Sequence, residues 1–269
     1  MQPQPSAAIW RGPQRGSALP IAWGPRKENP VSASSPGRYD LIVQQLVPGY
    51  ASLARLAVAL LSASPLAGPS GASVLVAGCG TGAELLEARA QRPDWRLLAI
   101  DPSAAMLEAA QQRLAAATPD GASAAAATLA APENPITWQQ TTVEALEADN
   151  SLDGALSVLV MQSLPDDGTK LAFLTALARA LRPGGQLVLV DLMAPERSPL
   201  LQQVDAAWVG FQKASGITLA EAAVTGLTQG VHPIGGSRLA ALVEAAGFSD
   251  PAPIFQALSV QGYLLQKLP

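Results

Sequence analysis

The chain has 269 residues, 49% of them hydrophobic and 14% charged, which predicts one folded core of ordinary size and excludes disorder over most of its length. Its 17 basic and 21 acidic residues give a net charge of -4 at pH 7 without a basic run, so we expect no nucleic-acid partner. The longest apolar runs, such as residues 53–61, fall well short of the roughly 18 residues that a membrane helix needs, and we expect a soluble protein with no membrane contact.

Residues 1–37 are rich in proline and are interspersed with glycine, serine and glutamine, so no helical or strand period survives in them. We therefore expect a disordered arm over residues 1–37 and one folded domain over residues 38–269. Docking of Trp10 or Trp23 on the folded body is the alternative for this arm. The arm also lacks the apolar core of a signal peptide, and we expect a cytoplasmic protein.

Helical spacing of apolar residues begins at Tyr39, is broken at Pro48-Gly49 and resumes over residues 53–61. Residues 74–82 then read Val-Leu-Val-Ala-Gly-Cys-Gly-Thr-Gly, which predicts a buried strand that runs into a glycine-spaced turn. Without Cβ atoms, these glycines can adopt positive φ and let the backbone approach a ligand closely. A helix is expected behind the turn over residues 83–90, an arrangement typical of a site for a nucleotide cofactor.

Cys79 lies inside this turn and is the only cysteine, so no intramolecular disulfide can form. We interpret it as a small residue that fills the turn rather than as a nucleophile. The second predicted strand, residues 97–100, ends at Asp101, nineteen residues after Gly82. A carboxylate at that strand end can accept hydrogen bonds from both hydroxyls of a ribose.

The remaining pattern alternates strands and helices along the chain. Helix 103–117, capped by Ser103, is followed by an alanine-rich surface insertion over residues 118–135. Strands are expected over 136–140, 155–160 and 186–190, and helices over 170–181, 199–215, 219–228 and 237–246. Two strand-length runs, 248–255 and 258–266, form a closing hairpin that places an antiparallel strand at the sheet edge. The pattern predicts an α/β fold with helices on both faces of the sheet.

Two later motifs complete a family resemblance. They are Asp153-Gly154-Ala155-Leu156-Ser157-Val158-Leu159-Val160 and Leu181-Arg182-Pro183-Gly184-Gly185. With the glycine turn and Asp101, they make the chain resemble a class I S-adenosylmethionine-dependent methyltransferase. That resemblance implies a Rossmann-like, seven-stranded sheet, S-adenosyl-L-methionine as cofactor and methyl transfer to a small-molecule acceptor.

Further segments resemble one subgroup, the carboxy-S-adenosylmethionine synthases of wobble-uridine tRNA modification and their methyltransferase relatives. These segments are Val47-Pro48-Gly49-Tyr50, Met161-Gln162-Ser163-Leu164 and Phe211-Gln212-Lys213-Ala214-Ser215-Gly216, and the similarity extends over about residues 39–267. The expected cofactor-binding residues are Tyr50, Gly78, Cys79, Gly80, Gly82, Asp101, Pro102, Met106, Thr142 and Val143. The turn would hold the methionine end and Asp101 the ribose, and Pro102, Met106 and Val143 the adenine faces.

Three positions depart from the family pattern. The residue two before Gly78 is usually acidic, and here it is Val76; the adenine-side aspartate is Thr142. The synthases hold their extra carboxylate with an arginine, whereas His232 is the only residue between Lys213 and Arg238 that can carry a positive charge. Because carboxylate recognition normally uses a guanidinium, we expect methyl transfer rather than synthase activity.

Several alternatives stay open. Gly78-x-Gly80-x-x-Ala83 also fits an NAD-binding fingerprint, and a non-catalytic adenosyl-binding module is a further possibility for a chain with Val76 and Thr142. Four residues are candidate bases: Glu84, Asp191, Glu221 and His232. The simpler interpretation is that the three acids lie on helix surfaces or at a strand end and that His232 lies in a loop. Trp208 and Phe211 are expected either to line a substrate pocket or to pack in the core. No metal site is expected, no catalytic base is singled out, and a homodimer is compatible with the sequence.

Overall fold

The computed structural model describes residues 36–117, 135–216 and 230–269. The expected arm therefore lies outside the described residues up to residue 35, as does almost all of the insertion expected over residues 118–135. The helix expected over residues 219–228 also lies outside them.

The centre of the fold is a seven-stranded sheet with the order β3-β2-β1-β4-β5-β7-β6. The four pairings from β3 to β5 are parallel, and β7 runs antiparallel to both β5 and β6. The strands are β1 Ser73–Ala77, β2 Arg96–Ile100, β3 Thr137–Gln139, β4 Leu152–Val158, β5 Leu181–Leu192, β6 Ala252–Ala257 and β7 Val260–Gln266. The predicted α/β class, seven strands and closing antiparallel hairpin are confirmed.

The helices alternate with the strands as the pattern predicts. They are α1 Pro36–Leu46, α2 Tyr50–Ser62, α3 Ala83–Gln91, α4 Ala104–Ala117, α6 Thr169–Ala180, α7 Leu201–Ala214 and α9 Gly236–Ala245, with a 3-10 turn η2 at Met161–Ser163. The predicted boundary between helix 170–181 and strand 186–190 was wrong at one point. Strand β5 begins at Leu181, which pairs with Leu152, and not at Gln186. A register shift separates this first pair from the regular pairing with β4 that starts at Gln186.

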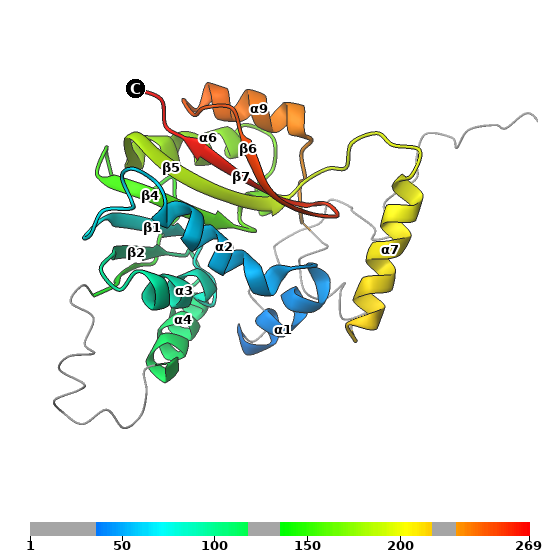
Figure 1. Ribbon diagram of the computed structural model, residues 1–269, viewed down its shortest axis with the longest axis horizontal. Coiled ribbons are helices and arrows are strands. Elements are labelled where there is room, and N and C mark those ends of the chain that lie inside the picture. The colour runs from blue at the N-terminus through cyan, green and yellow to red at the C-terminus, as the bar shows by residue number, and fades with distance from the viewer. Residues whose placement is uncertain (1–35, 118–134, 217–229) are drawn as a thin grey trace, which may run out of the picture.

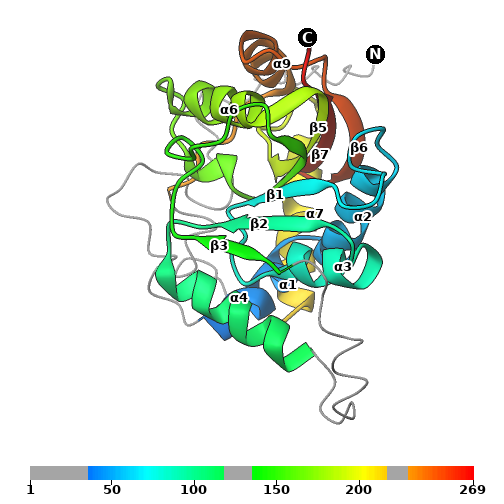
Figure 2. The same cartoon turned by 90° about the vertical axis from the view of Figure 1, so that its left-hand side faces the viewer.

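Helices cover both faces of the sheet (Figures 1 and 2). On one face α6 and α9 bury a cluster that includes Phe173, Leu177 and Leu242. On the other face α2, α3 and α4 form a second core with the sheet. Helix α2 approaches β4 so closely that a Cβ at Gly154 would lie 2.8 Å from Leu61, so the glycine permits this packing.

A sharp corner joins α1 to α2 at Gly49. Its φ is +80°, and a Cβ there would lie 3.2 Å from the Phe255 ring on β6, so glycine is required for both reasons. Within the described residues no single helix is long and apolar enough to cross a membrane; α1 and α2 pass such a test only as a pair, bent by 92°.

Helix α7 stands apart from the sheet, on the side to which the tip of the β6–β7 hairpin points (Figure 1). It packs against α1, where the Trp208 indole N–H donates a 2.7 Å hydrogen bond to the Leu46 carbonyl. Trp208 belongs to the apolar core and is 8% exposed, so the core-packing interpretation of this residue is confirmed.

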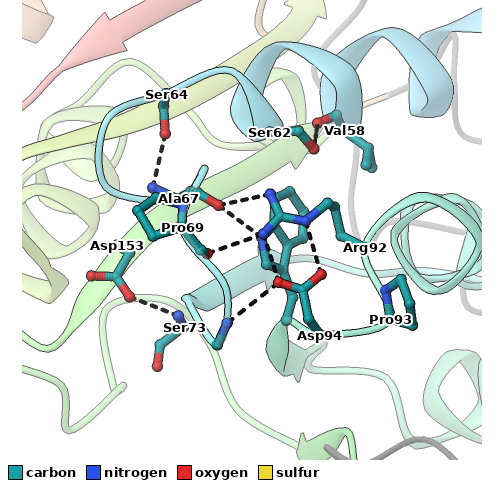
Figure 3. Close-up of polar contacts among 12 residues, drawn as sticks. Val58, Ser62, Ser64, Ala67, Pro69, Ser73, Arg92, Pro93, Asp94 and Asp153 are labelled. Atoms are coloured by element: carbon teal, nitrogen blue, oxygen red, sulfur yellow. Dashed lines mark hydrogen bonds and ion pairs between the residues drawn. The ribbon is translucent and has the colours of Figure 1, made fainter.

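Loops at the amino end of the sheet are tied together by Arg92 (Figure 3). Its guanidinium makes a bidentate pair with Asp94, at 2.9 and 2.7 Å, and donates to the carbonyls of Ala67 and Pro69 at 3.0 Å. It also lies 4.8 Å from the centre of the Trp95 ring. The Arg92 hydrogen bonds lower the pKa of Asp94 to about 2. Arg92 thus clamps the loop before β1 to the loop before β2.

We predict that Arg92→Ala lowers the free energy of unfolding by about 2 to 3 kcal/mol, since hydrogen bonds to charged groups contribute about 1.5 to 3 kcal/mol each and do not add fully. Urea unfolding at pH 7 measures this. Arg96→Ala is the matched control, because Arg96 is exposed at the start of β2. Equal stabilities of the two variants would show that the Arg92 clamp contributes nothing to the fold.

Candidate functional site at the carboxyl edge of the sheet

The turn after β1 has the geometry that its glycines predict. Gly78, Gly80 and Gly82 have φ values of +65°, +50° and +84°. A Cβ on Gly78 would lie 2.6 Å from Val160, whereas no described atom lies within 4 Å of a Cβ built on Gly80. The turn is therefore closed at Gly78 against Val160, in the segment that follows β4, and open at Gly80, where a ligand can meet bare backbone.

Asp101 is fixed at the end of β2 by two backbone donors. Gly80 N–H donates to its Oδ2 at 3.0 Å, and Ser103 N–H donates to its Oδ1 at 2.8 Å. The side chain is 8% exposed, and burial raises its pKa although both hydrogen bonds oppose that rise. Each oxygen keeps a second lone pair. The carboxylate is therefore held in one orientation with acceptor capacity left for a diol.

The expected adenine-side residues divide between the surface and the core. Pro102 and Thr142 are exposed, and the Pro102 carbonyl accepts a 3.2 Å hydrogen bond from Gln140 beyond β3. Met106 and Val143 are 7% and 5% exposed, and Val143 packs in the core cluster beneath the edge. The ends of β2 and β3 thus bring these residues to one corner of the sheet, and their contacts with adenine stay a prediction.

Helix α1 is attached to the glycine turn by a polar network. Asp40 accepts hydrogen bonds from the Thr81 hydroxyl and, at 2.9 Å, from Arg113 on α4. Arg113 also contacts the Thr81 carbonyl at 3.5 Å. This network lines a groove of about 680 Å³ between α1 and α4, and it holds α1 over the turn.

Four groups near the turn have raised pKa values. Burial is the main cause for Tyr39, Tyr50, Cys79 and Glu84, and it raises the pKa of the Cys79 thiol to about 12 and that of the Glu84 carboxyl to about 7. Cys79 is thus protonated at neutral pH, which agrees with a filling role. Glu84 is 7% exposed, so the helix-surface interpretation of this residue is wrong.

A second buried polar group supports the loop after β4. Asp191 on β5 accepts a 3.0 Å hydrogen bond from Gln162 N–H, and Lys170 Nζ donates at 2.6 Å to the Met161 carbonyl. Both side chains are 1% exposed, and burial raises the pKa of Asp191 to about 7. Asp191 and Lys170 therefore fix η2, the segment that follows the carboxyl end of β4.

The other sequence candidates do not converge on the turn. His232 N–H donates to the Gln162 carbonyl at 2.6 Å, and Arg238 pairs with Asp166 at 2.9 Å, while Glu221 lies outside the described residues. Among the residues that the structure describes, no group of three or more His, Cys, Asp or Glu side chains could hold a metal ion. Pattern reasoning missed the Lys170–Asp191 support because only the folded chain buries these two residues together.

Comparison with known proteins finds a family whose model matches the part of the chain that forms this edge. Residues 75–187, from β1 into β5, match the model of a family described as a methyltransferase domain. No curated protein matches the sequence.

Solved structures share the fold at low sequence identity. The Burkholderia thailandensis 1,6-didemethyltoxoflavin-N1-methyltransferase, solved with 1,6-didemethyltoxoflavin and S-adenosylhomocysteine, has a TM-score of 0.58 and 16% identity over 91% of this chain and 93% of that one. Human N-acetylserotonin methyltransferase, solved with SAM, gives 0.56 and 17%, covering 89% and 58% of the two chains. Mitomycin 7-O-methyltransferase gives 0.53 and 19%, covering 80% and 54%.

The chain spans little more than half the length of the last two enzymes. Because 1064 solved chains match, structural likeness of this degree identifies the fold and not the reaction. The family match over residues 75–187 and the fold shared with solved methyltransferases agree, and the glycine turn and Asp101 lie at the carboxyl edge of the sheet.

Proposed function

We propose that the protein transfers a methyl group from S-adenosyl-L-methionine to a small acceptor. One observation carries this proposal: the Asp101 carboxylate is fixed 3.0 Å from Gly80 N–H, beside the open part of the glycine turn. A fixed carboxylate next to bare backbone is what an adenosyl ribose requires at a strand end. Neighbours solved with SAM or S-adenosylhomocysteine support the choice of cofactor.

The described residues fit this cofactor. The turn leaves space at Gly80, Asp101 retains acceptor capacity for ribose hydroxyls, and Tyr50 begins the helix that packs near the turn. Among the described residues around the turn, acidic side chains are more numerous than basic ones such as Arg113. This excess of negative charge suits a ligand that carries a positive sulfonium and a positive ammonium.

Bound S-adenosylmethionine supplies an electrophilic methyl group on sulfur. This chain contributes orientation and exclusion of water, which account for most of what a methyltransferase must provide. Lys170 and Asp191 hold η2 beside the site, and Trp208 fixes α7 against α1. No residue is assigned as a general base, because the need for one depends on whether the acceptor atom carries a proton that must leave when the methyl group is transferred.

We expect the acceptor to be small and partly hydrophobic. The neighbours support the same class, because their names specify a toxoflavin precursor, N-acetylserotonin and a mitomycin. A cytoplasmic location, a homodimer and the absence of a nucleic-acid partner stay predictions from the sequence.

A synthase that makes carboxy-S-adenosylmethionine is the second candidate, suggested by the Met161–Leu164 and Phe211–Gly216 segments. It needs a cation for the extra carboxylate. Arg113, which contacts the glycine turn, is already paired with Asp40 at 2.9 Å, and Arg55 and Arg238 are paired with Glu87 at 3.5 Å and with Asp166 at 2.9 Å. This pairing favours the methyltransferase over the synthase.

We predict that Asp101→Ala weakens S-adenosylmethionine binding roughly tenfold to a hundredfold, because charge-assisted hydrogen bonds contribute about 1.5 to 3 kcal/mol. Calorimetric titration measures the affinity, and Asp250→Ala is the matched control because Asp250 is exposed before β6. Wild-type protein that binds no S-adenosylmethionine would refute the proposed function. Unchanged affinity in Asp101→Ala would remove Asp101 from the cofactor site.

We further predict that S-adenosylmethionine binds at least roughly tenfold more tightly than its carboxylated derivative, a difference of about 1.4 kcal/mol. An unpaired carboxylate in an apolar pocket costs several kcal/mol. Parallel titrations of both compounds at pH 7 test this, with prephenate incubation expected to yield none of the derivative. Tighter binding of the carboxylated form would mean that Arg55 or Arg197 reaches the site and would establish the synthase.

A further inference from the structure

The strand position that is usually acidic in this fold carries no charge here. Val76 is 2% exposed on β1, pairs with Ala99 and Leu156 in the sheet, and belongs to the apolar core. No acid therefore lies two residues before Gly78, where it would help to hold a positively charged ligand group. Any carboxylate for that purpose must come from another element.

Glu84 is a buried carboxylate close to the same turn. It lies in the first turn of the nine-residue helix α3, two residues after Gly82, and is 7% exposed. Among the described residues its side chain forms no ion pair within 4 Å and accepts a hydrogen bond only from its own backbone N–H. Arg113 acts on it electrostatically, but the Arg113 guanidinium is bound to Asp40 at 2.9 Å.

The groups that respond to Glu84 show where its carboxylate lies. Burial is the main cause of the raised pKa values of Tyr39 on α1, Tyr50 on α2 and Cys79 in the turn, and the nearby charge of Glu84 adds to each rise. Glu84, in the first turn of α3 behind the glycine turn, therefore lies near groups of α1, of α2 and of the turn. Asp101 borders the turn from the β2 side, so the two acids flank it from different elements.

We propose that the Glu84 carboxylate binds the α-ammonium of the methionine part of the cofactor, replacing the acid that is absent at Val76. This inference rests on the proposed function. A carboxylate with unused lone pairs complements an ammonium, which donates three hydrogen bonds, better than a sulfonium, which donates none. A buried charge without a counter-ion is costly, and the bound ammonium would supply the counter-ion that the Glu84 carboxylate lacks among the described residues.

Proton linkage gives a second readout. Burial is the main cause that raises the pKa of Glu84 to about 7; the hydrogen bond from its own backbone N–H and the charge of Arg113 oppose the rise, and Asp40 adds to it. A bound ammonium favours the charged form, so binding releases a proton and strengthens as pH rises through 7. Between pH 5.5 and 7.0, below the ammonium's own pKa of about 8, the charged fraction rises by about tenfold.

The test uses the full chain and three ligands: S-adenosylmethionine, S-adenosylhomocysteine and 5′-methylthioadenosine, which has no amino-acid end. We predict that Glu84→Gln weakens the first two by roughly tenfold to a hundredfold in calorimetric titrations and leaves 5′-methylthioadenosine within about twofold. Glu87→Gln is the matched control, because Glu87 lies one turn along α3 and pairs with Arg55 and Gln91. This control should leave all three affinities unchanged.

Other outcomes overturn the assignment. Equal loss for all three ligands would mean that Glu84 only shapes the turn, and loss for S-adenosylmethionine alone would mean that it faces the sulfonium. If Glu84→Gln does not fold, the wild-type affinity must still rise about tenfold from pH 5.5 to 7.0 with release of a proton; a flat profile would refute the proposal. Wild-type protein that binds none of the ligands would instead refute the proposed function itself.

Discussion

The hydrogen bond from Gly80 N–H to the Asp101 carboxylate, 3.0 Å long, joins the glycine turn to the end of β2. It exists because β1 and β2 are adjacent and parallel, so their carboxyl ends meet at one edge of the sheet. Gly80 has a φ of +50° and no side chain, and no described atom lies within 4 Å of a Cβ built on it, so the turn is open there. The proposed cofactor site depends on this bond, since it fixes the acceptor for the ribose and the shape of the turn together.

Around that bond, the site is built from buried acids on different elements. Asp101 comes from the end of β2, Glu84 from α3 and Asp191 from β5, and burial raises the pKa of each. Asp101 and Asp191 accept backbone hydrogen bonds that fix their positions, whereas Glu84 lacks a counter-ion among the described residues. Other residues therefore fix the carboxylates of Asp101 and Asp191, whereas the Glu84 carboxylate stays available for the proposed contact with an ammonium.

Local patterns predicted the strands, the glycine conformations and the closing hairpin, because strand period, missing Cβ atoms and chain alternation are properties of short segments. They missed features created by distant contacts. The bond between Trp208 and Leu46 joins residues 162 positions apart, and only the folded core buries Glu84. The start of β5 was also misplaced, because pairing of Leu181 with Leu152 overrides the Pro183-Gly184 break signal.

A crystal structure of the protein with S-adenosylhomocysteine tests the cofactor site most directly. The account predicts both ribose hydroxyls within hydrogen-bonding distance of the Asp101 carboxylate, with the Gly80 bond retained and the amino-acid end over the glycine turn. An adenosyl group bound elsewhere, or an Asp101 side chain turned away from the ribose, would contradict it.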